Sequence, residues 1–494
     1  MVLRELVAIL ANKDVKGSAD VEVTGLAYHT SAVKPGYLFA CWRGSHYDGH
    51  DFAAEAVKRG AKVILAEAGL DLPAPVTQVL VPDSRRALAL LAAQFWGHPS
   101  RLMRVVGVTG TNGKTTTTHL IRHILSRNGH RVGLLGTVRN VVCDRELPVH
   151  HTTPESVDVM PLMAQMVECG SSYCVMEVSS HALAQGRVAG CEFAVAVMTN
   201  VTQDHLDFHG TFTQYLEAKA RLFSALATGY LGQPRGKKLG VVNADDPSWG
   251  RFAEEARRGG VGVFTYAVDS PADLVAGEVK IGATATHFLA RSGGTEAPVR
   301  IPLVGRFNVY NSLAALAVAV GEGIPLAVAA RALGDAPQVP GRFELVDRGQ
   351  DFTVVVDYAH TPDGLENVLR TAREITHGRV ILVFGCGGDR DRTKRPIMGK
   401  LAGELSDLAV VTSDNPRTED PGQIIKDIEG GMGEGCSYRV EPDRRRAIGL
   451  ALAEAQAGDL VLIAGKGHET YQIIGERTLP FDDREVVREL LGRR

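Results

Sequence analysis

The sequence lacks any stretch of about 18 uninterrupted apolar residues, so we expect no transmembrane helix. The apolar stretch at the N-terminus is short and interrupted by charged residues, which disfavours a secretory signal. The seven cysteines contain no C-x-x-C pair, and their number is odd. This pattern argues against both a disulfide framework and a zinc site. Together these absences predict a cytoplasmic protein in a reducing compartment.

An excess of positive charge is also missing, because the formal net charge is −3. A general nucleic-acid or membrane-surface role, which would need a basic face, is therefore disfavoured. Local basic pockets for small anionic molecules remain possible. The chain is 45% hydrophobic and 22% charged, an ordinary globular mixture, and its 494 residues are too many for one hydrophobic core.

Short apolar, β-branched runs alternate with amphipathic helical patterns along most of the chain. This alternation predicts an α/β protein with largely parallel sheets. Two joints, at 97–100 and at the proline-rich segment 336–341, separate the patterned stretches. We therefore expect three domains, at about 1–99, 100–336 and 337–494.

A glycine-rich turn between a predicted strand and a predicted helix occupies residues 107–116. Its spacing is G-x-x-G-x-x-G-K-T, with Val108 where a standard P-loop has glycine. Backbone N–H groups and the helix N-terminus can hold phosphates there, Lys114 can meet the β- and γ-phosphates, and Thr115 can bind Mg²⁺. The alternative is a chance glycine turn, which the flanking strand and helix disfavour. The segment predicts binding of ATP or GTP.

Three further side chains belong near this loop if the strands are parallel. Glu177 ends an apolar strand and can bind Mg²⁺ at the ligand edge of the sheet. His205 lies in a polar loop after another strand and is either a metal ligand or a structural histidine. Lys219 shares a helix face with apolar residues. Spacing alone slightly favours a surface lysine whose stem covers that face.

Four apolar strands in the last third of the chain each lead into a charged loop. In a parallel sheet these loops would meet at one edge. Arg390 and Arg417 suit carboxylates, whereas Asp414 and Glu469 suit ammonium groups. The combination predicts an amino-acid site, for a substrate with an extra amino and an extra carboxyl group. Four solvated loop tips are the alternative, and the glycines beside the charges disfavour it.

Several motifs are specific in combination. They are GVTGTNGKTT at 107–116, EVSSH at 177–181, TNVTQDHLDFHG at 199–210, YLEAKA at 215–220, GRFNVYN at 305–311, DYAHTPD at 357–363 and GCGGDRD at 385–391. On these motifs the chain resembles the Mur ligases of peptidoglycan synthesis over essentially its whole length. The unusual glycine spacing is that family's own version of the P-loop. The resemblance implies an N-terminal α/β UDP-binding domain, a central P-loop ATPase-type α/β domain and a C-terminal Rossmann-like domain.

The resemblance assigns roles to residues that match the family's motifs. It implies ATP contacts through Gly110, Thr111, Asn112, Gly113, Lys114, Thr115, Thr116, Asn308, Asn311, Arg342 and Asp357. It implies a catalytic set of Lys114, Glu177, His205 and Lys219, and two Mg²⁺ ions held by Thr115, Glu177, His205 and a carbamylated Lys219. A carbamate forms only on a neutral amine, about one lysine in a thousand at pH 7.4. An apolar setting raises the neutral fraction, so carbamylation requires a Lys219 that faces the protein interior.

The resemblance also places the other two substrates. A UDP-N-acetylmuramoyl dipeptide would contact Thr30, Ser45, His46, Tyr47, Thr152, Thr153, Ser179, Gln185 and Arg187. Where the family commonly has Asp-Ser-Arg, this chain has His29-Thr30-Ser31, which keeps the hydroxyl and loses the flanking charges. The amino acid would contact Arg390, Asp414, Asn415, Pro416, Arg417, Gly465 and Glu469. The run from Asp414 to Arg417 marks meso-diaminopimelate rather than lysine in this family.

The implied reaction is the ATP-dependent addition of meso-2,6-diaminopimelate to UDP-N-acetylmuramoyl-L-alanyl-D-glutamate through an acyl phosphate. A cytoplasmic monomer with small-molecule substrates, and with neither nucleic-acid nor membrane partners, is expected. A lysine-adding ligase is disfavoured by the motif ending at Arg417, and a folylpolyglutamate synthetase by the separate N-terminal domain with its 44–49 segment. A nucleotide-dependent binding module without catalysis is disfavoured by the retention of Lys114, Glu177, His205 and Lys219.

Overall fold

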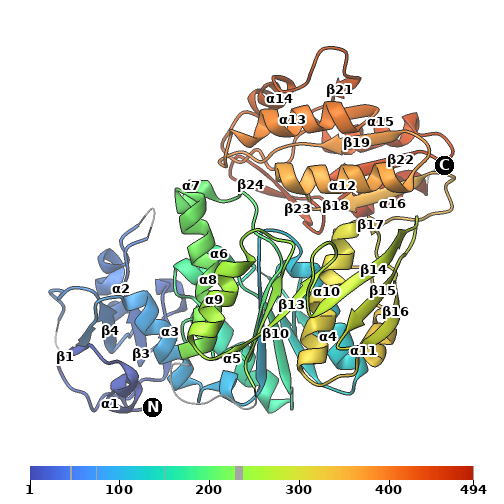
Figure 1. Ribbon diagram of the computed structural model, residues 1–494. Helices are drawn as coiled ribbons and strands as arrows, with labels where there is room; N and C mark the ends of the chain where they lie inside the picture. Colours follow the sequence, from blue (N-terminus) through green and yellow to red (C-terminus); the bar gives the residue numbers. More distant parts are fainter. Residues whose placement is uncertain (45–46, 74, 150, 229–236, 493–494) are drawn as a thin grey trace.

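Three large β-sheets, each formed by its own stretch of the chain, organise the protein (Figure 1). The computed structural model describes residues 1–44, 47–73, 75–149, 151–228 and 237–492. The first domain is blue, the central domain cyan to yellow and the third domain orange to red. Within the described part of the chain, no helix is both long and apolar enough to cross a membrane.

The first domain has a five-stranded sheet in the order β1-β5-β4-β3-β2. Only β1 is antiparallel to its neighbour. The strands are β1 (Asp14–Lys16), β2 (Gly25–Ala27), β3 (Tyr37–Ala40), β4 (Val63–Ala66) and β5 (Thr77–Leu80), and the helices are α1 (Leu3–Leu6), α2 (Ala53–Lys58) and α3 (Ser84–Phe95). Asp83 caps α3 by accepting the N–H of Arg86 at 2.8 Å, a bond that satisfies one unpaired donor at the helix start.

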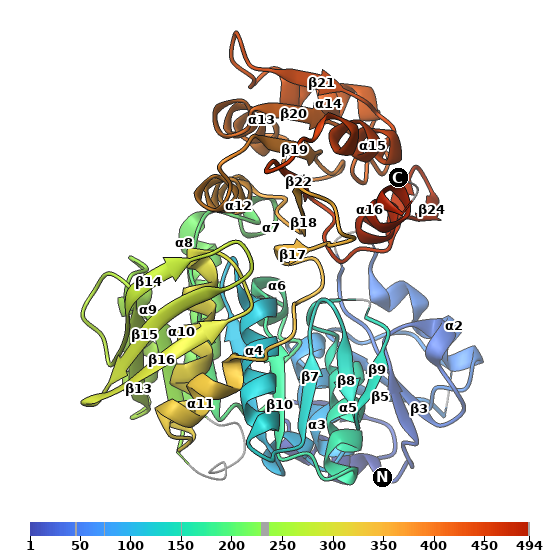
Figure 2. The same ribbon diagram turned by 90° about the vertical axis from the view of Figure 1, so that its right-hand side faces the viewer.

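The central domain has an eleven-stranded sheet in the order β16-β15-β14-β13-β12-β11-β6-β10-β7-β8-β9. Its middle strands, which are all parallel, are β6 (Arg104–Thr109), β7 (Val132–Leu135), β10 (Tyr173–Glu177), β11 (Val195–Met198), β12 (Leu239–Asn243) and β13 (Gly262–Ala267). At one end of the sheet, β8 (Asn140–Val142) and β9 (Arg145–Leu147) add antiparallel pairs (Figure 2). At the other end, β14 (Leu274–Ile281) pairs in parallel with β13, and β15 (Thr286–Ser292) and β16 (Thr295–Ile301) continue the sheet with antiparallel pairs.

Helices cover both faces of the central sheet. They are α4 (Lys114–Arg127), α5 (Ser156–Glu168), α6 (Ser180–Ala184), α7 (Leu206–His209), α8 (Phe212–Thr228), α9 (Trp249–Arg258), α10 (Arg306–Gly321) and α11 (Leu326–Leu333). Alternate residues of β6 point to opposite faces, so Val106 belongs to the core under α4 and α10, and Val105 to the core under α5 and α8. This two-sided burial explains why the strands read as continuous apolar runs.

The third domain has a six-stranded sheet in the order β17-β18-β22-β19-β20-β21, of which only β17 is antiparallel. The strands are β17 (Glu344–Leu345), β18 (Thr353–Asp357), β19 (Val380–Phe384), β20 (Leu408–Val411), β21 (Tyr438–Val440) and β22 (Leu460–Ala464). A separate hairpin joins β23 (Tyr471–Ile474) to β24 (Arg477–Pro480). The helices are α12 (Pro362–Ile375), α13 (Lys394–Leu405), α14 (Pro421–Glu429), α15 (Arg444–Glu454) and α16 (Asp483–Leu491).

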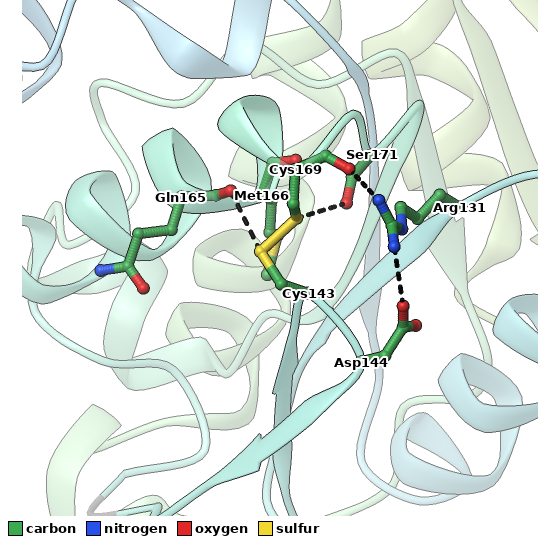
Figure 3. The surroundings of a disulfide bond; sticks show 7 residues. All are labelled: Arg131, Cys143, Asp144, Gln165, Met166, Cys169 and Ser171. Atoms are coloured by element: carbon green, nitrogen blue, oxygen red, sulfur yellow. Dashed lines mark hydrogen bonds and ion pairs between the residues drawn. A yellow bond between two sulfur atoms is a disulfide. The ribbon is translucent and has the colours of Figure 1, made fainter.

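A disulfide joins Cys143, in the turn between β8 and β9, to Cys169, which follows α5 (Figure 3). Their Cα atoms are 5.8 Å apart, although 26 residues separate them in sequence. The expectation that no cysteines are paired was wrong for these two. Packing of the hairpin turn beside the end of α5 brings them together, and no sequence spacing reveals that contact.

Candidate active site

The phosphate loop follows β6 and leads directly into α4, as the sequence predicts. Gly110 has φ 149° and Gly113 has φ 83°, both in the region that favours glycine. A Cβ on Gly110 would lie 1.9 Å from Thr199 Oγ1, so a side chain there has no room. Val108 lies inside β6 rather than in the turn, and therefore needs no glycine geometry.

Lys114, the first residue of α4, folds back over this loop. Its Nζ donates to the carbonyl oxygens of Gly110 at 2.8 Å and Thr111 at 2.7 Å. Burial lowers the pKa of Lys114, and nearby Glu177 partly opposes that shift. The lysine is thus held at the mouth of the loop, where phosphate oxygens can replace the carbonyls.

Glu177, at the end of β10, lies beside the first turn of α4. Its side chain is almost fully buried, and its Oε2 accepts the Thr115 hydroxyl at 3.0 Å. Thr137 donates to the same carboxylate through its backbone N–H at 2.8 Å and its hydroxyl at 2.9 Å. These hard oxygen atoms fit Mg²⁺, which binds few protein ligands and keeps positions for phosphate oxygens. No group of three or more His, Cys, Asp or Glu side chains suited to a metal occurs among the described residues.

Lys219, in the middle of α8, is buried and not at the surface, so the surface interpretation from spacing was wrong. It is 1% exposed, and its Nζ donates to the Gly110 carbonyl at 2.7 Å. The ammonium also lies 4.4 Å from the ring centre of Tyr215. Burial, together with the nearby charge of Lys114, holds the pKa of Lys219 well below its usual value. This environment raises the fraction of neutral amine.

His205 precedes α7 in a left-handed backbone conformation, with φ 54°. Its Nε2 lies 3.4 Å from Asp204 Oδ2, and its ring centre lies 4.7 Å from that of His181. Burial lowers the pKa of His205 to about 4, so the ring is neutral at neutral pH, the form that binds metals. A cavity of about 200 Å³ is lined by Lys114, Thr115, Glu177, His205 and Lys219, among others.

A second cavity, of about 450 Å³, lies on the other side of the phosphate loop and suits a nucleoside. Its lining includes Asn112, Gly113, Thr116, Asn311, Arg342 and Asp357. Asn308 does not line it: this residue donates to the Val304 carbonyl at 2.9 Å and accepts from Asn311 at 3.0 Å. The structure therefore places Asn308 behind Asn311, as a support.

Contacts across the phosphate loop join the third domain to the central one. Arg342 donates to the Thr115 hydroxyl at 3.0 Å and lies 4.6 Å from the ring centre of Tyr358. Asp357 accepts backbone N–H groups at 2.6 and 2.7 Å, and burial raises its pKa. Asp363, which the candidate set omits, accepts from Asn112 at 2.5 Å. Its place in the DYAHTPD motif was the signal that could have found it.

The charged loops of the third domain meet at one edge of the sheet, because β18, β19, β20 and β22 are parallel as predicted. A cavity of about 870 Å³ lies there, between this edge and the central domain. Its lining includes Asp204 and His205 from the central domain and Arg390, Asp414, Asn415, Arg417, Gly465 and Glu469 from the third. Pro416 is not in the lining. Arg417 donates to the Gly388 carbonyl at 2.7 Å, whereas Arg390 is exposed.

The residues expected to contact the muramoyl dipeptide form a bonded group beside Glu177. Thr153 donates to the Glu177 carbonyl at 2.9 Å and accepts the Ser179 N–H at 3.1 Å. Arg187 donates to the Thr153 carbonyl at 2.9 Å and to Gln185 at 2.7 Å. Thr152 and Ser179 also line the cavity that contains Lys114 and Glu177. The group therefore adjoins the phosphate loop.

The residues expected on the uridine side lie in the first domain. Thr30 is half-buried in a short 3₁₀ turn, and Tyr47 is 75% exposed. Ser45 and His46 lie outside the described residues.

Comparisons with known proteins bear directly on this arrangement. Three family models match in turn: the Mur ligase family catalytic domain at residues 22–96, the Mur ligase middle domain at 108–319 and the Mur ligase glutamate ligase domain at 341–467. A UDP-N-acetylmuramoyl-L-alanyl-D-glutamate--2,6-diaminopimelate ligase of Geobacillus thermodenitrificans is 48% identical, covering 100% of both chains. This chain belongs to the Mur ligase family.

Two other Mur ligases are also similar to this chain over nearly its whole length. The enzyme of the same name from Geobacillus kaustophilus is 47% identical over 100% of both chains. A solved structure of a UDP-N-acetylmuramoyl-L-alanyl-D-glutamate--2,6-diaminopimelate ligase is 33% identical, with a TM-score of 0.69 and 99% of each chain covered. The three-domain α/β architecture inferred from the sequence is confirmed by these matches.

Besides Asp363, sequence reasoning missed two further charged residues of this Mur ligase. Glu155 pairs with Arg187 at 2.9 Å and also with Arg85 of α3, so it links the first domain to the residues expected to contact the muramoyl dipeptide. Lys466 is fully buried behind the charged loops of the third domain. Its sequence neighbours Gly465 and Glu469 were singled out, but no local pattern shows that a lysine between glycines points into the protein.

Proposed function

We propose that this Mur ligase joins an amino group of meso-2,6-diaminopimelate to the γ-carboxylate of the D-glutamyl residue in UDP-N-acetylmuramoyl-L-alanyl-D-glutamate. ATP is converted to ADP and phosphate. The names of the relatives support this substrate pair. The observation that carries the proposal is that Asp414, Asn415 and Arg417, from the run at 414–417, line the large cavity between the third and central domains.

The first step is transfer of the γ-phosphoryl group to the glutamyl carboxylate. A carboxylate oxygen forms the bond to phosphorus while the bond to the β-phosphate oxygen breaks, giving an acyl phosphate and ADP. Lys114 and the N–H groups that begin α4 lie where they can neutralise the phosphate charge. Thr152 and Ser179, which line the same cavity, would orient the incoming carboxylate.

Magnesium fits the oxygen-rich side of this cavity. Thr115 and Glu177 would hold one ion, and His205 with a carbamate on Lys219 would help to hold a second. Bound Mg²⁺ supplies further neutralisation of the phosphate oxygens. The carbamate forms when the neutral Lys219 amine adds to CO₂ and loses one proton. The lowered pKa of Lys219 supports this modification.

The second step is attack of the diaminopimelate amine on the acyl phosphate, which releases phosphate. Arg417 would bind the distant carboxylate of the substrate, while Asp414 and Glu469 would bind its distant ammonium group. The contacts of Asp363 and Arg342 with the central domain hold the third domain over the loop. Such a closed arrangement excludes water that would otherwise hydrolyse the acyl phosphate.

The expected setting is the cytoplasm, where ATP is available, with small molecules as the reaction partners. A monomer is sufficient, because residues of one chain line all three cavities.

The decisive experiment measures ADP release with UDP-N-acetylmuramoyl-L-alanyl-D-glutamate and a panel of meso-diaminopimelate, L-lysine, L-glutamate or no amine. A separate reaction contains a folate and L-glutamate in place of the dipeptide and the panel. Release that requires both the dipeptide and meso-diaminopimelate is expected. Preference for lysine would overturn the amine assignment. Turnover with a folate and glutamate, or none with any pair, would instead indicate a folylpolyglutamate synthetase or a binding module. Mass spectrometry of the product identifies the new amide.

A further inference from the structure

Lys466 is a buried cation that the proposed reaction does not use. It follows β22 in a glycine-flanked loop, and its side chain is 0% exposed. It is absent from the lining of the large cavity, although Gly465 and Glu469 on either side of it are present there. A buried lysine is costly unless its charge is paired, so its partners indicate its role.

The hydrogen-bond and charge partners of Lys466 belong to the amino-acid pocket, the part of the 870 Å³ cavity lined by Arg390, Asp414, Asn415, Arg417, Gly465 and Glu469. Its ammonium also lies 5.6 Å from the ring centre of Tyr471. Its Nζ donates to Glu469 Oε2 at 2.9 Å and to Asn415 Oδ1 at 3.1 Å. It also lies 4.0 Å from Asp414 Oδ1. One ammonium thus joins loops that are about 50 residues apart in sequence, and it lies between the two carboxylates of the pocket.

The two hydrogen bonds to the Glu469 carboxylate fall on the same oxygen. Oε2 accepts from both Lys466 and Asn415, the latter at 2.8 Å. Among the described residues, neither Oε1 of Glu469 nor the carboxylate of buried Asp414 accepts a hydrogen bond. Lys466 therefore fixes one oxygen from behind and leaves the cavity-facing acceptors available for a substrate ammonium group.

The charge of Lys466 also affects the choice of substrate. Acidic residues outnumber basic ones in the cavity lining: Asp204, Asp207, Asp363, Asp391, Asp414 and Glu469 against Arg390, Lys394 and Arg417. Lys466, which lies 4.0 Å from Asp414, adds a positive charge that offsets part of this excess. Meso-diaminopimelate is a net-neutral double zwitterion, whereas lysine carries one net positive charge. A pocket that lost the Lys466 charge would favour the more cationic amine.

We propose that Lys466 is a positioning residue that sets the amine specificity of this pocket, by holding Glu469 and Asn415 from behind and by offsetting the acidic pair. The inference rests on the proposed function, because it concerns the same amine site. Lys466 touches no substrate and acts through Glu469, Asn415 and Asp414.

The test compares wild type with Lys466→Met, Lys466→Gln and Lys466→Arg in the full-length enzyme. For Lys466→Met we expect the KM for meso-diaminopimelate to rise about tenfold or more and the KM for ATP to change less than twofold. The ratio of kcat/KM for meso-diaminopimelate to that for lysine should fall about tenfold. Lys466→Arg, which keeps the charge, should restore part of that ratio.

A structural role alone would lower stability without changing this ratio. The matched control is Arg379→Met, which removes a cation paired with Asp459 at 2.8 Å at the opposite end of the same strands. It should lower Tm and leave both KM values and the ratio unchanged. If Lys466→Met does not fold, Lys466→Gln keeps a donor without the charge and should still lower the ratio.

An unchanged ratio in a folded Lys466→Met or Lys466→Gln enzyme overturns the inference and leaves the proposed function standing. If the wild type itself prefers an amine other than meso-diaminopimelate, the proposed function fails. Lys466 is then judged by the KM for the preferred amine, and an unchanged value overturns its positioning role as well.

Discussion

The phosphate loop and the amino-acid pocket are built in different ways. The phosphate loop is one short segment between β6 and α4, and Lys114 bonds carbonyls only three and four residues away. The amino-acid pocket draws on loops after several strands, and it is held by the side-chain contacts of Lys466 with Asn415 and Glu469. A local segment preserves its geometry through backbone conformation, whereas an assembled pocket depends on the relative placement of strands.

This difference predicts that the two sites can be damaged separately. The changes below run from the largest expected effect to the smallest.

Lys114→Met should nearly abolish the first chemical step. Among the described residues that line the 200 Å³ cavity, the lysines are Lys114 and Lys219. The substitution removes the charge of the one at the mouth of the phosphate loop. Loss of such charge stabilisation costs on the order of 10³-fold in kcat. Single-turnover ADP formation measures it, and diaminopimelate binding should persist. An active Lys114→Met enzyme would contradict the assigned phosphate role.

Lys219→Met should lower kcat by about 100-fold or more, because a carbamate can no longer form. Wild-type activity in CO₂-depleted buffer should rise when bicarbonate is added, and the variant should not respond. Steady-state phosphate release with and without bicarbonate gives both results. An equal bicarbonate response in the two proteins would show that Lys219 is not the modified group.

Arg417→Ala should damage the amino-acid pocket alone. Loss of one charge-assisted hydrogen bond costs about 1.5–3 kcal/mol, or roughly 10- to 150-fold in preference for meso-diaminopimelate over lysine. The KM for ATP should stay within about twofold. Competition kinetics with both amines provide the measurement. A parallel loss of ATP affinity would indicate that the two regions are not independent.

Cys143→Ser should directly affect neither the phosphate loop nor the amino-acid pocket, because the disulfide lies at one edge of the central sheet. Loss of a cross-link that closes a 26-residue separation should lower the free energy of unfolding by about 3 kcal/mol. Denaturant unfolding under non-reducing conditions tests this. Cys436→Ser, at an unpaired cysteine, is the control and should change stability little. Equal stability of the two variants would mean that Cys143 is unpaired in solution.

His360 lines all three cavities and so lies where the two regions meet. Burial, with the nearby charge of Lys394, lowers its pKa to about 4. Between pH 6.5 and 4 the unfolded chain therefore binds a proton that the folded protein does not, and stability falls as pH falls. His360→Gln should reduce that loss by about 2 kcal/mol between pH 7 and 5. Urea unfolding at the two pH values measures the difference, and identical pH dependence would contradict it.

How much of this protein could be predicted depends on the distance in sequence between interacting residues. The strand, turn and helix around Lys114 were predictable because glycines and a helix start leave local signals. The convergence of Asp414 and Glu469 was predictable once parallel strands were assumed. The burial of Lys219 was misjudged from spacing, because one helix face cannot reveal what packs over it. The pairing of Cys143 with Cys169 left no sequence signal.

The sequence by itself determined the family, the three α/β units and the positions of the phosphate and amino-acid motifs, since these depend on short-range periodicity and on residue types at fixed spacing. Only the tertiary structure decided that Asn308 stands behind Asn311, that Asp363 bridges two domains, and that Lys466 lies between two carboxylates. Those relations depend on side-chain directions and on packing between distant segments. Hydrogen-bond geometry and burial, which no local pattern contains, determine them.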